Sequence, residues 1–401
     1  MTNTSESANV GCKHKHSARA DGDEAKNVSA DAVANKGSTD SINMMSCEGR
    51  EENATASGAG ELEDKLLQLE ELLRSYGSVA LGYSGGVDST FLAAVLARCM
   101  QGRALLVHMD TPLVGTPERK SFEHLAGRFG LPVARLDLDS LADERIAANP
   151  QNRCYFCKRA DFALIVHEAR RQGYEVVIDG SNADDRSDDR PGMRALRELG
   201  VRSPLREVGW HKDEERELLR DWNLEVWSMP AGACLATRIP CGEPLTREKI
   251  DLVRACEDHL HGLGLAQVRA RLVDGQVQVQ ATPDDLALLA HLAKDEDAVD
   301  GETDNRTATS IGANRETASG GASFGKAPTV GAASNSKIAE PLASSCTGHG
   351  AGSASAPLDA VPLPHSVIAA FCSFGAKDVR PFAIPYRYGS MSGQSPTINS
   401  T

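Results

Sequence analysis

The chain has 401 residues, of which 25% are charged, and its formal net charge is −13. This length predicts two domains together with segments that do not fold. No run of about eighteen apolar residues occurs, which excludes an ordinary membrane-spanning helix, and the acidic balance argues against a protein that embraces RNA.

Two segments have the composition of chain that does not fold. Residues 1–60 contain few large apolar side chains, and residues 295–362 are rich in Ala, Ser, Gly and Thr. We predict that the first is a disordered tail and the second a disordered low-complexity insertion. Outside both, the formal charge is −5. The start of the chain lacks the apolar stretch of a secretory signal, so we expect a cytoplasmic protein with reduced cysteines.

Residues 61–244 alternate between strand-like and helix-like patterns. An amphipathic helix is expected first, because leucines recur at 62, 66, 69 and 73. Strands are expected at 78–83, 104–109, 132–136 and 175–179, and helices at 91–100, 118–129, 162–171 and 212–221. This alternation predicts an α/β domain with a parallel sheet and helices on both faces. Ligands should bind at the carboxyl ends of the strands.

The pattern changes after Pro244. A helix is expected at 247–263, followed by two short alternating strands at 267–273 and 276–280 and by a helix at 283–293. Order is expected to resume near residue 366. We assign 245–294 and 363–401 to one small α/β domain that the insertion interrupts.

The most informative motif is the segment Ser84-Gly85-Gly86-Val87-Asp88-Ser89-Thr90, between an expected strand and an expected helix. Adjacent glycines let backbone N–H groups surround an anion, and the helix N-terminus adds positive charge. The hydroxyls of Ser84, Ser89 and Thr90 can donate to phosphate, and Asp88 can hold Mg²⁺. The loop lacks the lysine of a Walker loop. It resembles the PP-loop of the ATP pyrophosphatase superfamily, which cleaves ATP between the α and β phosphates; an ordinary helix-capping turn is the alternative.

The cysteines form a second pattern. Cys154 and Cys157 are a Cys-x-x-Cys pair, and Cys234 and Cys241 lie close together farther along the chain. The pair can direct two thiolates at one metal, with a third ligand from a distant segment. The spacing leaves three interpretations open: half of a structural zinc site that Cys234 and Cys241 complete, a redox pair, or part of a cluster ligand set.

The order of the motifs narrows these interpretations. The chain carries, in sequence, SGGVDST, NRCYFCK, IDGSNADDRSDDRPGMRAL, SPLREVGWHKDEER and CLATRIPCG. This series resembles the LarE-type sulfur insertase family, from about Leu62 to Ala293 and again over 386–391. The resemblance implies an adenine nucleotide alpha hydrolase-like fold. It also implies that ATP adenylates a carboxylate of a pyridinium mononucleotide, and that sulfur then displaces AMP to give a thiocarboxylate, in the biosynthesis of the nickel-pincer cofactor of lactate racemase.

The resemblance also suggests how sulfur is supplied. One branch of the family has a single cysteine, matched here by Cys234, which gives up its own sulfur. A second branch has three cysteines that hold a 4Fe–4S cluster, and this sequence matches it at Cys154, Cys157 and Cys234. Three ligands leave one iron open for a transferable sulfide. Cys241 stands where we expect an aromatic residue, so a fourth ligand stays an open alternative.

Four arginines are candidates for binding the substrate. Arg190 follows an acidic loop and can pair with a phosphate, unless that loop is only a solvated surface. Arg238 can neutralise a substrate carboxylate or form a surface ion pair. Arg269 and Arg271 alternate along a strand and resemble the family's phosphate-binding arginines; an exposed strand face is the alternative. The resemblance further implies a homo-oligomer whose subunit contacts complete the site.

Three other functions fit parts of this pattern. A PP-loop tRNA thiolase also joins such a loop to cluster cysteines, but it has to bind RNA, which the charge of −5 disfavours. An amide-forming ligase of the NAD- or GMP-synthase kind has no use for the cysteines. A non-catalytic scaffold is disfavoured by the intact loop. We therefore predict an ATP-dependent sulfur transferase that uses ATP, Mg²⁺ and a 4Fe–4S cluster and that binds neither nucleic acid nor membrane.

Overall fold

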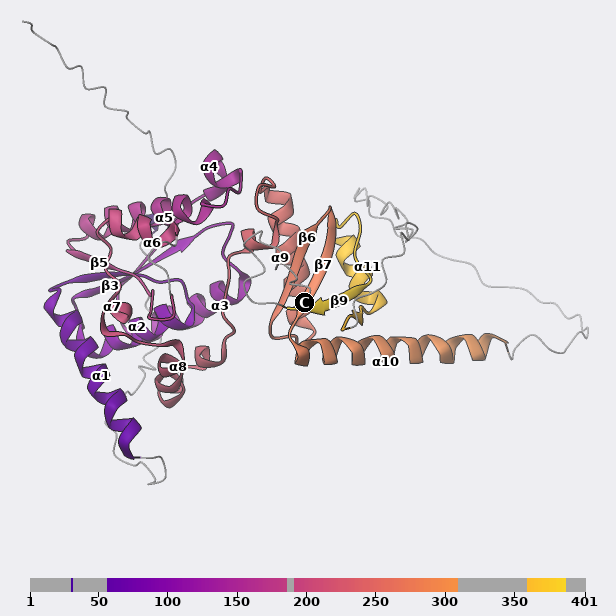
Figure 1. Cartoon of the computed structure of the whole chain (residues 1–401), viewed down its shortest axis with the longest axis horizontal. Coiled ribbons are helices and arrows are strands. Elements are labelled where there is room, and N and C mark those ends of the chain that lie inside the picture. The colour runs from indigo at the N-terminus through magenta and orange to yellow at the C-terminus, as the bar shows by residue number, and fades with distance from the viewer. Residues whose placement is uncertain (1–29, 32–55, 186–190, 309–358, 387–401) are drawn as a thin grey trace, which may run out of the picture.

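Figure 1 shows the computed structural model of the chain. The structure describes residues 30–31, 56–185, 191–308 and 359–386. Arg190, residues 387–391 and most of the two segments expected to be disordered lie outside the described residues.

The first part of the chain is built on a parallel sheet. Its four strands, in spatial order, are β4 (Val133–Asp137), β3 (Ala104–Asp110), β2 (Val79–Gly82) and β5 (Val176–Ile178). Leu81 is the register partner of Leu106 on one side and of Ile178 on the other. A two-residue strand, β1 (Ala30–Asp31), pairs antiparallel with the edge strand β4. The predicted parallel sheet is thus confirmed.

The helices of this part lie on both faces of the sheet, as predicted (Figure 1). Alternate strand residues point to opposite faces. Leu81 and Leu106 pack with α1, α2 and α8, whereas Ala80, Leu105 and Val107 pack with α5 and α6. The helices concerned are α1 (Ala56–Ser75), α2 (Val87–Cys99), α3 (Thr116–Leu125), α4 (Glu144–Ala147), α5 (Arg153–Arg171), α6 (Pro191–Glu198), α7 (Pro204–Val208) and α8 (Lys212–Asp221).

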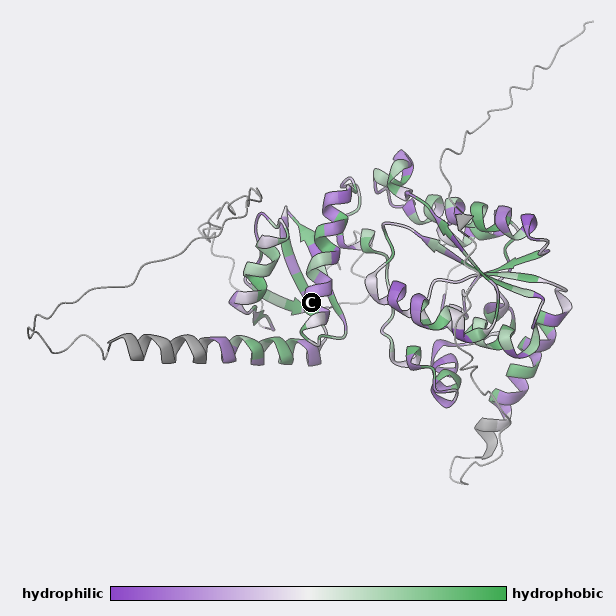
Figure 2. Ribbon diagram, turned by 180° about the vertical axis from the view of Figure 1, so that it is seen from behind, coloured by the Kyte–Doolittle hydropathy of each residue, from purple (hydrophilic) through white to green (hydrophobic). Residues whose placement is uncertain are grey.

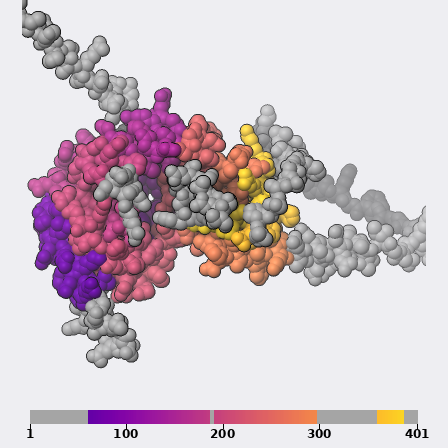
Figure 3. Space-filling model, viewed as in Figure 1, coloured from indigo at the N-terminus to yellow at the C-terminus, as the bar shows by residue number. Residues whose placement is uncertain are grey.

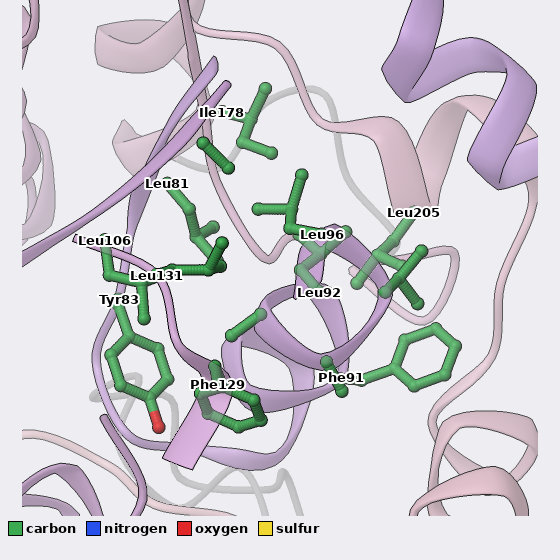
Figure 4. Packing of buried hydrophobic residues seen from close by; sticks show 14 of the residues in the cluster. Leu81, Tyr83, Phe91, Leu92, Leu96, Leu106, Phe129, Leu131, Ile178 and Leu205 are labelled. Atoms are coloured by element: carbon green, nitrogen blue, oxygen red, sulfur yellow. The ribbon is translucent and has the colours of Figure 1, made fainter. Parts of the chain in front are cut away.

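The core between the sheet and α2 holds the nucleotide loop in place. In Figure 4, Leu81, Leu106 and Ile178 extend from the strands toward Leu92 and Leu96 of α2. These leucines are fully buried. Burial of each such side chain contributes roughly 1.5–3 kcal/mol to the free energy of folding. The strand and the helix that flank the loop are therefore held firmly against one another.

A second, smaller sheet follows. Its strand order is β6 (Val268–Val273), β7 (Gln276–Ala281), β9 (Phe382–Pro385) and β8 (Val361–Pro362). The β6–β7 turn has positive φ at Asp274 and Gly275, as the tight turn of a two-residue hairpin requires. Helices α9 (Arg247–Gly262), α10 (Pro283–Ala308) and α11 (His365–Ser373) accompany this sheet. Helix α10 continues past residue 294, where the sequence analysis placed the start of the insertion.

The two parts share a core and lie against each other as adjacent lobes in Figure 3. Leu113 and Leu235 from the first part pack with residues of α9 and β6. The Arg254 guanidinium on α9 donates to the carbonyls of Val114 and Pro112 at 2.6 and 2.5 Å. Figure 2 shows the strands of the large parallel sheet as mainly hydrophobic, whereas β6 and β7 of the small sheet alternate between hydrophilic and hydrophobic residues and the helices have mixed faces. No helix in the described ranges is long and apolar enough to cross a membrane.

Four 3₁₀ helices complete the described elements. They are η1 (Ala126–Phe129), η2 (Ser140–Ala142), η3 (Glu225–Ser228) and η4 (Leu235–Arg238). The last begins directly after Cys234 and packs on α9 and β6. The Cys234 segment therefore lies at the junction of the two parts.

Candidate active site

The glycine loop leaves β2 and opens α2, as the sequence predicts. Gly85 has φ +83°, and a Cβ there would lie 2.5 Å from the carbonyl oxygen of Glu118 on α3. Both the conformation and the space therefore require glycine. Gly86 is the N-cap of α2, and no side chain caps the helix. The first N–H groups of α2 are consequently available to an anion.

The loop hydroxyls are held in two different ways. Ser84 Oγ and Ser89 Oγ lie 3.0 Å apart, and Ser89 Oγ donates to the Gly86 carbonyl at 3.2 Å. Both serines line the larger of two cavities described below, and Ser84 also lines the smaller one. Thr90, by contrast, is fully buried with its hydroxyl 3.3 Å from the Tyr83 hydroxyl. Its predicted contact with ATP remains a prediction.

Asp88 lies at the centre of a polar network that the sequence analysis did not predict. Its Oδ2 lies 3.1 Å from Lys212 Nζ, and its Oδ1 accepts from Asn182 Nδ2 at 3.0 Å. The same Asn182 amide donates to Glu215 Oε1 at 3.0 Å. Burial, and then the neighbouring Asp88, raises the pKa of Glu215 well above its usual range, which favours the neutral form of this carboxyl. The sequence signals were the positions of Asn182 in the IDGSNADD motif and of Lys212 and Glu215 in the GWHKDEER motif.

The end of β5 packs directly against the loop. Asp179 is buried and accepts from the Ser181 and Ser203 hydroxyls at 2.5 and 2.6 Å. A Cβ at Gly180 would lie 3.1 Å from the Ser89 nitrogen. The carboxyl ends of β2 and β5 therefore meet at the position where an α/β fold binds its ligand.

Two neighbouring cavities join the loop to the cysteines. One, of about 410 Å³, is lined by Ser84, Gly86 and Asp88 together with Cys157 and Cys234. The other, of about 530 Å³, is lined by Ser84, Asp88 and Ser89 together with Cys154. Both are bordered by Lys158 and Asp161. The structure thus brings together two motifs that are about seventy to one hundred and fifty residues apart in the chain.

Cys154, Cys157 and Cys234 lie near one guanidinium, that of Arg153. Arg153 begins α5, and Cys154 and Cys157 lie in the first two turns of that helix. Arg153 Nη2 lies 3.9 Å from Cys234 Sγ, and all three thiols interact electrostatically with Arg153. Burial raises the pKa of Cys157, and the neighbouring Cys234 adds to the effect. Cys234 is reached from the cavity, yet the protein around its sulfur raises its pKa, an effect that Arg153 opposes.

The donor set can be compared with the metal sites that the sequence suggested. Cys241 Sγ lies 3.5 Å from the Asn149 carbonyl oxygen. Among the described residues, no three or more His, Cys, Asp or Glu side chains are already arranged around a single metal position, so neither the zinc site nor the cluster site is preformed. Three soft thiol donors, a neighbouring cation and an open cavity nevertheless fit a thiolate-ligated cluster.

Lys158 and Asp161 are further cavity residues that the sequence analysis did not single out. Lys158 Nζ lies 3.9 Å from Asp179 Oδ2. Burial raises the pKa of Asp161 to about 6, which Lys158 partly offsets. Asp161 Oδ1 is buried and has no hydrogen-bond partner among the described residues. The helical spacing from Cys157 to Asp161 places both on one face of α5, which could have drawn attention to Asp161.

The predicted arginines lie at the junction with the small sheet. Arg238 is buried and forms a two-pronged ion pair with Glu257, at 2.7 and 2.9 Å. Its Nη1 also donates to the Ala233 and Cys234 carbonyls. Arg269 Nη2 donates to the Ala231 carbonyl at 2.9 Å, and Arg238 and Arg269 border a cavity of about 160 Å³.

Arg271 belongs to the same group of positive charges. Burial and then Arg238 lower the pKa values of both Arg269 and Arg271. The structure thus brings together three of the four predicted arginines, while Arg190 lies outside the described residues. Arg238 and Arg269 hold the Cys234 segment through the contacts above, and binding of substrate by these arginines remains a prediction.

Comparison with known proteins agrees with this geometry. The family model for asparagine synthase matches residues 67–221. An uncharacterised protein of Synechocystis is 35% identical over 225 residues, which are 56% of this chain and 84% of that protein. The pyridinium-3,5-bisthiocarboxylic acid mononucleotide synthase of Lactiplantibacillus plantarum is 32% identical over 212 residues, 52% of this chain and 76% of the synthase. A glutamine-hydrolyzing GMP synthase polypeptide of Methanosphaerula palustris is 31% identical over 193 residues, 44% of this chain and 61% of that polypeptide.

A parallel sheet with an SGGxDS loop at the start of α2, matched by this family model, defines a PP-loop ATP pyrophosphatase fold and an enzyme that uses ATP. Within that class, the chain belongs to the LarE family.

Proposed function

We propose that this protein is an ATP-dependent sulfur transferase. A carboxylate of a pyridinium mononucleotide attacks the α-phosphorus of ATP and displaces pyrophosphate. Sulfur then attacks the acyl carbon and displaces AMP, which leaves a thiocarboxylate for the nickel-pincer cofactor of lactate racemase-type enzymes. The observation that carries this proposal is the cavity that Ser84, Gly86 and Asp88 share with Cys157 and Cys234. The printed name of the L. plantarum relative supports the same chemistry.

The loop and its neighbours suit the adenylation step. The uncapped N–H groups of α2 and the Ser84 and Ser89 hydroxyls would bind the phosphates, and Lys212 brings a positive charge to Asp88. Asp88 would hold Mg²⁺, which supplies neutralisation of phosphate charge as the α–β bond breaks.

The cysteines suit the transfer step. Cys154, Cys157 and Cys234 would hold a 4Fe–4S cluster, which supplies a sulfide that leaves without loss of a protein atom. The alternative within the family is that Cys234 gives up its own sulfur once. Cys241 contacts Asn149 in this structure, and its place as a fourth ligand stays open.

Product analysis tests the proposed function. Purified anaerobic protein, ATP and the pyridinium mononucleotide should give AMP, pyrophosphate and a thiocarboxylate; formation of ADP would contradict it. Cys154→Ala and Cys157→Ala should abolish multiple turnover and leave ATP binding intact, whereas Cys99→Ala on α2 is the matched control. Mass spectrometry separates the sulfur sources. Loss of hydrogen sulfide from Cys234 after one turnover, in iron-free protein, would establish the single-use mechanism.

The amide-forming ligases are the second candidate, because the GMP synthase polypeptide of M. palustris is 31% identical. That likeness extends over 44% of the chain. Full activity of Cys154→Ala with an amine as acceptor would favour this candidate. Tight, salt-sensitive tRNA binding would favour a tRNA thiolase instead.

Assembly is also part of the proposal. The small sheet presents Arg269 and Arg271 beside Arg238, and in the family the subunit contacts complete the substrate site. We expect a homo-oligomer with no nucleic acid or membrane partner. A monomer with full activity in light scattering would contradict the oligomer.

A further inference from the structure

Arg153 is a buried cation that lacks an acidic partner among the described residues. The residue is only 8% exposed. The carbonyl oxygen of the Asn149 side chain accepts from its Nη1, but this amide is neutral. Its Nε is buried without a hydrogen-bond partner among those residues. An uncompensated buried charge is unfavourable, so Arg153 requires a negative charge nearby.

Within the described part of the chain, the groups near Arg153 that can supply this charge are the three thiols. Arg153 Nη2 lies 3.9 Å from Cys234 Sγ, and Cys154 and Cys157 follow Arg153 at the start of α5. Negative charges on these three sulfurs would repel one another, because like charges repel. Arg153 and the uncapped N-terminus of the 19-residue helix α5 both oppose that repulsion.

Asn149 fixes Arg153 in this position. Asn149 is fully buried, has φ +54°, and donates from Nδ2 to the Pro240 carbonyl at 2.8 Å. Through Asn149 the Arg153 side chain is joined to the segment that follows Cys234. A single arrangement thus holds the guanidinium between the Cys-x-x-Cys turn and the distant third cysteine.

We propose that Arg153 is a positioning residue that acts as counter-ion to an anionic sulfur group at Cys154, Cys157 and Cys234. The ligand class is a thiolate-ligated iron–sulfur cluster, which would form when the three thiols release their protons to solvent and bind iron together with added inorganic sulfide. The unused Nε–H is a donor for a sulfur atom of that group. This inference rests on the proposed function. It concerns the electrostatic balance of the sulfur site and not the reaction itself.

The test compares charge removal with charge retention. Arg153→Met removes the cation at similar length, Arg153→Lys keeps it, and Arg171→Met removes an exposed cation from the far end of the same helix. After anaerobic incubation with equal amounts of ferrous and ferric iron and with sulfide, we expect Arg153→Met to bind iron about tenfold more weakly than wild type, as loss of a supporting contact does at other metal sites. Arg153→Lys should retain most of the binding, and Arg171→Met all of it.

A second measurement separates this role from a purely structural one. The urea midpoint of the unloaded Arg153→Met protein should equal or exceed that of wild type, because a buried charge without an anion has been removed. A lower urea midpoint of unloaded Arg153→Met than of unloaded wild type would overturn the proposal, because Arg153 would then stabilise the fold without any bound anion. Undiminished iron and sulfide in Arg153→Met would overturn it as well.

Failure of this inference can be told apart from failure of the proposed function. Wild-type protein that takes up no iron would overturn this inference, since no anion would balance Arg153. If the same protein still formed thiocarboxylate and AMP, the proposed function would stand and the sulfur would come from Cys234.

Discussion

The ion pair between Arg238 and Glu257 offers a direct test of how the two parts of the chain hold the Cys234 segment. Both side chains are almost fully buried, at 4% and 7% exposed. Glu257 Oε1 also accepts from the Ala270 backbone at 2.9 Å. In Glu257→Gln the shape is kept, but Arg238 stays buried near Arg269 with no negative charge to offset either.

Breaking a buried ion pair at one partner destabilises a protein by about 3–5 kcal/mol. With a urea dependence of roughly 3 kcal/mol per molar, the unfolding midpoint should fall by about 1–1.7 M. Circular dichroism in urea measures this midpoint. Asp251→Asn, an exposed position on the same helix, is the control and should shift the midpoint little.

A double-mutant cycle extends this test by adding the single variant Arg238→Met and the double variant Arg238→Met with Glu257→Gln. The double variant should be more stable than Glu257→Gln alone, because it no longer buries the unpaired Arg238 cation. A Glu257→Gln midpoint within about 0.3 M of wild type would refute the reasoning, since the pair would then contribute no more than an exposed one.

Three further predictions concern the nucleotide site. Gly85→Ala should abolish ATP binding in calorimetry, because its Cβ would collide with the Glu118 carbonyl; Gly102→Ala, also at positive φ but with nothing within 4 Å, should keep it. Lys212→Met should weaken ATP binding about tenfold by removing the cation beside Asp88, whereas Lys249→Met, at a surface pair with Glu243, should not. Asp161 is protonated more readily when folded, so its contribution to stability is full below pH 3.8 and declines as pH rises to about 6. Asp161→Asn should therefore gain stability over wild type across that range in urea unfolding, and a difference that does not change with pH would contradict the raised pKa.

The sequence by itself determined the elements whose signals are local. The strand–loop–helix at 79–99 follows from apolar patterning, adjacent glycines and loop hydroxyls, all within about twenty residues. Alternation of such elements fixes a parallel sheet with two covered faces, and the direction of parallel strands fixes the edge where ligands bind. The β6–β7 hairpin has the same kind of local origin in the Asp274-Gly275 turn.

Only the tertiary structure decided which side chains meet. Lys212 and Glu215 are far from Asp88 in the chain, and the motif that contains them does not say which distant residue the folded helix sets them beside. Arg153 and Glu257 read as ordinary charged residues of helices, yet packing buries both beside the cysteine segment. The reason is physical: local patterns report which face of an element is apolar, but the partner of a buried charge depends on how distant elements pack.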